Sequence, residues 1–360
     1  MPVSKQSDPE PTFVHRALIV IALAAVALLL WQLRTVLVLL FGAVVMGTIF
    51  RAIAEPLSKH LRLPGGVAVL TSVLLIVGVL VGVAWLLGQQ ISAQADALAQ
   101  TLPRALAQVD NWLGGFGLAH PFETWFAQLH SNGGTLVSRF GSWLSTASNG
   151  VANFLIVFFG GVFLASEPRF YRIGAIKLIP EASRGVFAQA LDESERALRL
   201  WLKGELIAML VIGIMTGAGL WLLGVQSWLV LGILAGFFEF IPFAGPILSA
   251  IPGILIALVQ SPELALWTGL MYIFVQHSEA YLIQPIIQQY AVDVPAVVLL
   301  FSLLAFAALF GAIGILFAAP LSVVTYVLVK RLYVIEALDT PTPIPGENKE
   351  DPIQTPSDRK

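Results

Sequence analysis

Residues 229–260 read LVLGILAGFFEFIPFAGPILSAIPGILIALVQ, an apolar run interrupted by one carboxylate and several helix-breaking residues. The interruptions are Glu239, Pro242, Gly245, Pro246 and Pro252. Proline removes a backbone hydrogen-bond donor and clashes with the preceding helical turn. Inside a bilayer, carbonyl groups freed in this way are tolerated only where protein or a water-filled cavity covers them. The stretch is therefore not an ordinary lipid-facing helix.

The charges around this stretch all have one sign. Residues 204–329 contain no Lys or Arg but hold Glu205, Glu239, Glu263, Glu279 and Asp293. A buried carboxylate without a basic partner must be protonated, neutralised by a bound cation, or hydrated, and each state suits a transport path. An interfacial position in water is the alternative for Glu205, Glu263 and Asp293, and it fits Glu263 and Asp293 best. Glu239 and Glu279, in contrast, have apolar neighbours on both sides.

The composition places the whole chain in a bilayer. Of its 360 residues, 57% are hydrophobic and 12% are charged, and the mean hydropathy is +0.84. Soluble domains carry about 25% charged residues. The fold class is therefore an all-α polytopic membrane protein with about eight hydrophobic segments. The net charge of −2 does not indicate the basic surface that nucleic-acid binding requires. The absence of cysteine excludes disulfides and thiolate sites.

The first part of the chain predicts a cytoplasmic tail over residues 1–16 and three transmembrane helices over residues 17–87. No cleavable signal peptide is evident, because the first apolar run leads directly into further membrane segments. A tight helical hairpin is expected where Arg34 and Thr35 separate the first two runs. The basic residues of 51–64 should face the cytoplasm by the positive-inside rule.

The rest of the chain divides by composition. We expect an amphipathic helical insert outside the membrane over 88–145 and a transmembrane helix over 146–166. Residues 167–204 form a basic cytoplasmic segment with an amphipathic helix. Residues 205–332 form a transport core. The Pro-rich, charged tail 333–360 should be disordered and cytoplasmic.

A second overlong run, residues 296–329, is interrupted by Gly311, Gly314 and Pro320. As one helix of about 32 residues, either run would measure about 48 Å, whereas the hydrocarbon core measures about 30 Å. Each run must fold back as a re-entrant hairpin or tilt steeply with a break. The positive-inside rule does not distinguish between these two arrangements. Paired Gly/Pro-interrupted segments are a sequence pointer to a transporter binding site.

Four motifs carry a family resemblance: WLKGE at 201–205, EFIPFAGP at 239–246, QHSE at 276–279 followed by Pro285, and the segment 311–321. With them, nearly the whole chain resembles the autoinducer-2 exporter family of bacterial membrane proteins. Two departures are Glu205, where the family usually has Gln, and Asp293 in a usually apolar stretch. The resemblance implies export of a small solute such as a signalling furanone, or sodium/proton antiport. It also implies a bacterial inner membrane and a homo-oligomer such as a pentamer.

We expect a secondary transporter that couples a small solute or cation to protons or sodium through intramembrane carboxylates. The expected pathway residues are Glu239, Glu279, Glu205, Gln276, His277 and Gln284. The expected hinge or backbone-ligand residues are Pro242, Gly245, Pro246, Pro252, Pro285, Gly311, Gly314 and Pro320. Helix kinks and close packing explain these glycines and prolines equally well. His277 lies two residues from Glu279 and so does not share its helix face, which favours packing over proton relay.

Other functions are weighed on the same residues. An oligomeric channel would use a carboxylate ring for cation selectivity, and a Na+/H+ antiporter would need no organic substrate. An intramembrane enzyme is disfavoured, because the sequence contains neither HExxH nor GxSxG. No metal site and no cofactor is expected. The expected partners are the lipid bilayer and a small solute, a monovalent cation or a proton.

Overall fold

The computed structural model describes residues 13–86, 136–285 and 294–343, and within these ranges it is helical without a β-strand. An unlabelled helix spans Gly65–Leu86. The labelled helices are α1 (Phe13–Gln32), α2 (Arg34–Leu61), α5 (Leu136–Ser166), α6 (Pro168–Lys177), α7 (Arg184–Leu222), α8 (Trp228–Phe238), α9 (Ala244–Gln260), α10 (Pro262–Ser278), α12 (Ala296–Phe310), α13 (Ala312–Leu316) and α14 (Ala318–Leu328). The all-α fold class is confirmed.

Several helices are long and apolar enough to cross a bilayer. In the described part of the chain, four meet this test: Arg34–Leu61, Gly65–Leu86, Glu181–Leu222 and Ala318–Ile335. A fifth is possible if Gly150–Ser166 and Pro168–Lys177, which meet at a 94° bend, form one span. Large apolar side chains such as Leu74, 61% exposed, and Ile214, 62% exposed, cover their surfaces. The protein is thus a multi-pass membrane protein, whereas the count of eight segments stays a prediction.

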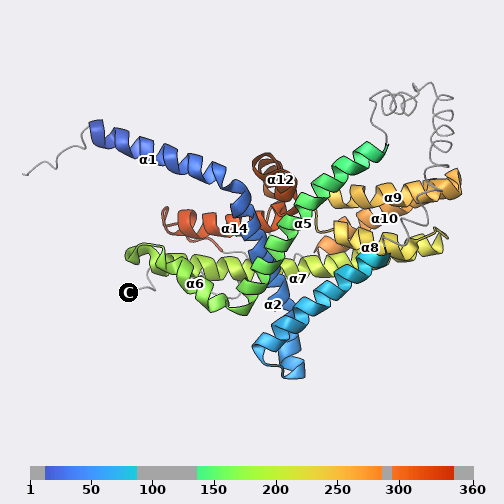
Figure 1. The fold of residues 1–360 in the computed structure, drawn as a ribbon, viewed down its shortest axis with the longest axis horizontal. Coiled ribbons are helices and arrows are strands. Elements are labelled where there is room, and N and C mark those ends of the chain that lie inside the picture. The colour runs from blue at the N-terminus through green and yellow to red at the C-terminus, as the bar shows by residue number, and fades with distance from the viewer. Residues whose placement is uncertain (1–12, 87–135, 286–293, 344–360) are drawn as a thin grey trace, which may run out of the picture.

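The hairpin expected between the first two runs is wrong. The N–H of Leu33 donates to the carbonyl of Leu29, and that of Leu37 donates to Leu33, both at 2.9 Å. These bonds bridge a one-residue interruption at Leu33, and no Gly or Pro is present to reverse the chain direction. Figure 1 shows α1 projecting away from the other helices rather than lying along α2.

Small residues bring α2 and α5 into close contact. A Cβ added to Gly160 would lie 2.8 Å from the Cβ of Ala43, and one added to Gly161 would lie 2.8 Å from that of Met46. Close backbone approach is the usual basis of helix packing in membranes, where burial of apolar surface drives little association. The pair α2 and α5 thus forms a compact support for the rest of the molecule.

The longest helix, α7, joins two segments that the sequence suggested separately. Its 39 residues include both the amphipathic cytoplasmic segment and the following apolar run. Ion pairs connect its first half to α2: Arg199 lies 2.6 Å from Glu55 and 2.7 Å from Glu195, and Arg51 lies 3.6 Å from Glu195. These side chains are partly exposed, so each pair contributes at most about 1 kcal/mol. Their effect is to fix where α7 crosses α2.

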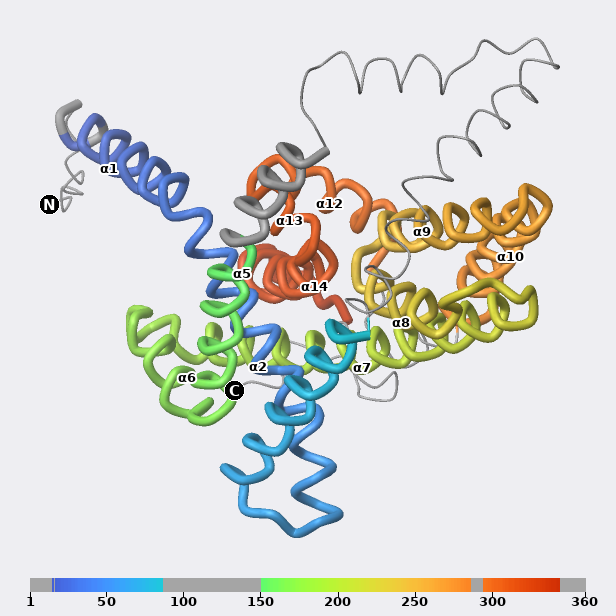
Figure 2. The backbone as a smooth tube through the Cα atoms, turned by 45° about the vertical axis from the view of Figure 1, so that its right-hand side comes forward, coloured from blue at the N-terminus to red at the C-terminus, as the bar shows by residue number. Residues whose placement is uncertain are grey.

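Both interrupted runs fold back on themselves. α8 packs on α9, and α12 packs on α13 and α14. Figures 1 and 2 show α8, α9 and α10 together beside the C-terminal half of α7. The tips of both folded-back runs reach one central core, where Phe240 from the first run and Phe310 and Ile313 from the second pack against Leu202 and Phe317. The depth of either hairpin in a membrane stays a prediction.

Candidate functional site

The first break, residues 239–243, is built by a tight and strained turn. The N–H of Ala244 donates to the carbonyl of Pro242 at 2.7 Å, which closes a three-residue γ-turn. Its central residue, Phe243, has φ +63° and ψ −38°. This form of the γ-turn is rare and strained for a bulky residue. Such strain persists only where surrounding structure enforces it, which marks the break as a candidate functional region.

The same close crossing occurs at both folded-back runs. A Cβ at Gly245 would lie 2.0 Å from the carbonyl oxygen of Phe238, and a Cβ at Gly314 would lie 2.0 Å from that of Phe306. Only glycine fits where backbones approach so closely. The faint sequence similarity between the two runs therefore coincides with a shared packing device.

Three carboxyl groups from distant parts of the chain meet beside the first break. Glu239, at the end of α8, and Glu279, just after α10, are 9% and 7% exposed. Their side chains lie within hydrogen-bonding reach of each other, and Glu205 of α7 lies close enough to act electrostatically on both. An ionised carboxylate can only accept, so a bond between two carboxyls requires a proton on one of them. We name Glu205, Glu239 and Glu279 the carboxyl cluster.

Two amides hold Glu279 in place. Gln276 Nε2 donates to Glu279 Oε2 at 2.8 Å, and Gln284 Nε2 donates to Oε1 at 3.3 Å. Glu279 also begins a π-helical segment, Glu279–Ile283, that continues α10. Such π-helical turns are frequent at functional sites because they redirect side chains. Among the described residues, no three His, Asp or Glu side chains are arranged to hold a metal ion.

The remaining expected site residues are spread over the core. His277 is exposed and pairs its Nδ1 with the carbonyl of Ile273 at 2.9 Å, so it does not join the carboxyl cluster. Pro252 lies inside α9, and Pro285 follows the π-helical segment. Gly311, at φ +66°, forms the second break, and buried Pro320 lies in the first turn of α14. Asp293 is outside the described residues.

A cavity of about 710 Å³ borders the carboxyl cluster. It lies between α2, the helix Gly65–Leu86, α5, α7 and the tips of both folded-back runs. Among the described residues that line it, Glu205 and Asn153 are the polar ones. Glu205 is only partly buried, as expected for a side chain that faces a cavity. We name this space the central cavity.

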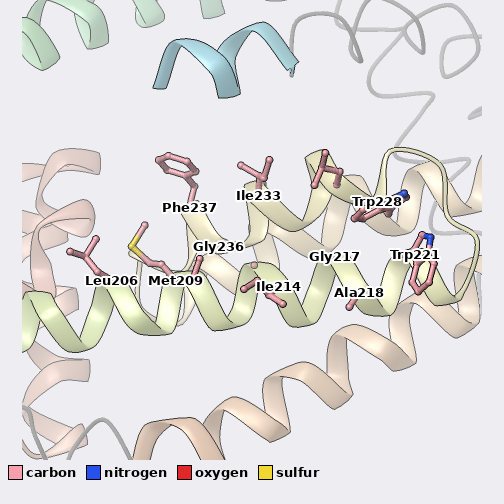
Figure 3. A pocket seen from close by; sticks show the side chains of 13 residues that line it. Leu206, Met209, Ile214, Gly217, Ala218, Trp221, Trp228, Ile233, Gly236 and Phe237 are labelled. Carbon is pink, nitrogen blue, oxygen red and sulfur yellow. The ribbon is translucent and has the colours of Figure 1, made fainter. Parts of the chain in front are cut away.

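A second hollow, of about 830 Å³, runs along α7 and α8 (Figure 3). Its walls are apolar, with Trp221 and Trp228 towards one end and Phe237 towards the other. It follows the line where Gly217 of α7 meets Gly232 of α8, whose added Cβ would lie 2.7 Å from the Cα of Gly217. Because no carboxylate or amide lines it, this larger hollow offers no chemistry for coupling.

Tyr272 was not among the site residues predicted from the sequence. It lies on α10, on the N-terminal side of Glu279. Its side chain is buried in the core formed by α7 to α10, and its hydroxyl has no hydrogen-bond partner among the described residues. The same holds for the hydroxyl of Thr268, one turn earlier. The available signal was the spacing of Thr268 and Tyr272 on one face of an apolar helix.

Tyr272→Phe is expected to stabilise the protein by about 1–3 kcal/mol, because it removes a buried polar group that lacks a partner. The measurement is the thermal unfolding midpoint of detergent-purified protein. Tyr333→Phe, at a position 59% exposed, serves as the matched control and should leave the midpoint unchanged. A lower midpoint for Tyr272→Phe would mean that the hydroxyl is satisfied in the working protein.

Comparisons with known proteins agree with this architecture. A family model described as AI-2E family transporter matches residues 18–333. YueF of Bacillus subtilis, whose name calls it a transport protein, is 23% identical over 306 residues, covering 79% of this chain and 80% of YueF. YrrI of the same organism, named in the same way, is 28% identical over 151 residues, covering 42% of this chain and 43% of YrrI. PerM of Escherichia coli K12, named a permease, is 25% identical over 163 residues, covering 45% of this chain and 46% of PerM. The chain thus spans less than half the length of YrrI and PerM.

Proposed function

Because this chain belongs to the AI-2E transporter family and is a membrane transporter, we propose that it is a secondary transporter coupled through its carboxyl cluster. In this proposal, Glu239 and Glu279 exchange a proton for a monovalent cation or a cationic solute. The observation that carries it is the neighbouring pair of buried carboxyls in a region, residues 204–329, that has no Lys or Arg.

The exchange follows from charge balance. While the pair holds one proton, only one of the two groups is ionised. Loss of that proton leaves two adjacent negative charges in an apolar region, which is strongly unfavourable unless a cation takes the proton's place. A cation would find the carboxylate oxygens of the pair, which are the kind of ligand that hard cations prefer. Gln276 and Gln284 keep Glu279 oriented in both states.

Access from the two sides of the membrane is proposed to come from the folded-back runs. Their tips meet at the central core, so a shift of either tip opens or closes a route to the cluster. We further propose a bacterial inner membrane, cytoplasmic termini and a homo-oligomer such as a pentamer. The basic residues of 167–203 support a cytoplasmic position for that segment.

The test is the internal pH of vesicles reconstituted with purified protein when sodium, lithium or potassium is added outside. We expect a cation-dependent pH change that is absent from protein-free vesicles and persists in Glu263→Gln. Glu263 is an exposed carboxylate at the other end of α10, which makes it a matched control. No pH change with sodium, lithium or potassium, in vesicles shown to contain folded protein, would refute exchange of protons for these inorganic cations and leave a cationic solute as the substrate class to screen. Cation uptake without proton movement would favour a channel.

A further inference from the structure

The central cavity has the dimensions of a small-molecule site. Binding pockets for organic ligands measure about 300–1,000 Å³ and are mostly apolar, with a few placed polar groups. The cavity's volume of about 710 Å³ and its apolar walls fit this description. It also lies where the α2 and α5 support meets the tips of both folded-back runs, so its shape changes if either tip moves.

Among the described residues that line the cavity, Glu205 of α7 is the charged one. Glu239 and Glu279, which interact electrostatically with Glu205, do not line it. The bases that precede Glu205 on α7, Lys203 and Arg199, do not line the cavity either, and Arg199 is paired with Glu55 and Glu195. Gly65–Leu86, Gly150–Ser166 and α12 to α14 carry no charged residue. On α2, the charged residues in the described ion pairs, Arg51 and Glu55, are paired with each other and with α7. An unpaired carboxyl in an apolar wall therefore sets the preference of the site.

We propose that the central cavity binds a small hydrophobic cation, with its apolar body between α2, α5 and the two tips and its charge at Glu205. This inference deepens the proposed function and rests on it for the coupling step alone. The cation's positive charge compensates the negative charge of the Glu205 carboxylate. Its apolar body packs against the apolar walls, which cannot solvate a hydrophilic ion. An anion of the same shape is repelled by the cluster.

Binding is linked to proton release. When the cation arrives, a carboxyl of the cluster gives its proton to the solvent, and the resulting carboxylate pairs with the cation. One positive charge enters and one leaves, so the net charge of the site is unchanged. Because Glu205 acts electrostatically on both Glu239 and Glu279, the cation and the proton compete for the same negative charge.

The probe is tetraphenylphosphonium, a cation that can neither donate nor accept a proton. Its binding to the purified full-length protein is measured by calorimetry, and proton release is followed with a pH-indicator dye in weakly buffered solution. Tetraphenylborate, of the same shape and opposite charge, reports the sign preference. The variants are Glu205→Gln, which removes the charge, and Ile76→Trp, which fills the cavity from its Gly65–Leu86 wall. Glu263→Gln is the matched control.

We expect saturable tetraphenylphosphonium binding with proton release, weakened at least about tenfold by Glu205→Gln, since a partly buried charge pair is lost. Ile76→Trp should weaken binding, and Glu263→Gln should not. Equal binding by wild type and Glu205→Gln overturns the proposal, as does equal binding of tetraphenylborate, which would indicate a space for lipid chains. Glu205-dependent binding without pH changes driven by sodium, lithium or potassium in vesicles would keep this site and refute the exchange of protons for inorganic cations. Vesicle antiport without tetraphenylphosphonium binding would do the reverse.

Discussion

Glu279→Gln is expected to abolish cation-driven proton movement, with a rate at least about a hundredfold below wild type, because an amide cannot exchange a proton for a cation. Glu279 is the member of the carboxyl cluster that contacts most other polar groups: Gln276, Gln284 and Glu239. The measurement is the initial rate of internal pH change in vesicles that contain equal amounts of folded protein. Glu239→Gln should give the same result.

The folded state is expected to survive this change. Glutamine has nearly the shape of glutamate, and replacing a buried ionisable group by a neutral one removes a cost of desolvation. Size-exclusion elution of the variant should therefore match that of the wild type. Wild-type rates in both variants would refute coupling through the cluster. Loss of folded protein in both would instead identify a structural carboxyl pair.

Gly245→Ala is expected to lower the free energy of unfolding by more than about 3 kcal/mol. The new Cβ would lie 2.0 Å from the carbonyl oxygen of Phe238, so α8 and α9 could no longer cross as they do. Gly314→Ala should have a similar effect through the carbonyl of Phe306. The measurement is the thermal unfolding midpoint and the yield of monodisperse protein.

The matched control is Gly78→Ala in the helix Gly65–Leu86, where an added Cβ meets nothing within 4 Å. It should be neutral or stabilise by up to about 1 kcal/mol, the usual gain of alanine over glycine in a helix. Retention of the wild-type midpoint in both Gly245→Ala and Gly314→Ala would contradict the close crossings at the two breaks.

The sequence predicted the fold class and the importance of the first break, because hydropathy and proline chemistry act locally. The sequence could not decide whether the interrupted runs fold back. The positive-inside rule depends on Lys and Arg, and residues 204–329 contain neither. The sequence also assigned α7 to two separate segments. In the structure, one helix continues through Lys203 and Gly204. The expected hairpin at Arg34 failed because the chain has no Gly or Pro there to reverse its direction, and α1 and α2 are separated by Leu33 alone.

The candidate site was predictable in its residue types and less so in its geometry. Glu205, Glu239 and Glu279 stood out as carboxylates without a basic partner, but their meeting depends on three helices far apart in sequence. The γ-turn at Phe243 had no sequence signal, because a bulky residue does not favour positive φ. The central cavity depends on the space between helices, which no local pattern records.

The unbroken length of α7 has a mechanical consequence. At 1.5 Å per residue its 39 residues form a rod of about 58 Å. The ion pairs of Arg199 with Glu55 and of Glu195 with Arg51 attach this helix to α2, at a point that is only about 9 Å from Glu205 and about 33 Å from Trp221 when measured from Arg199. A tilt of about 10° would move Glu205 by less than about 2 Å and the Trp221 end by about 6 Å. A tilt of α7 about this attachment would therefore move α8, α9 and α10 widely while Glu205 stays nearly in place.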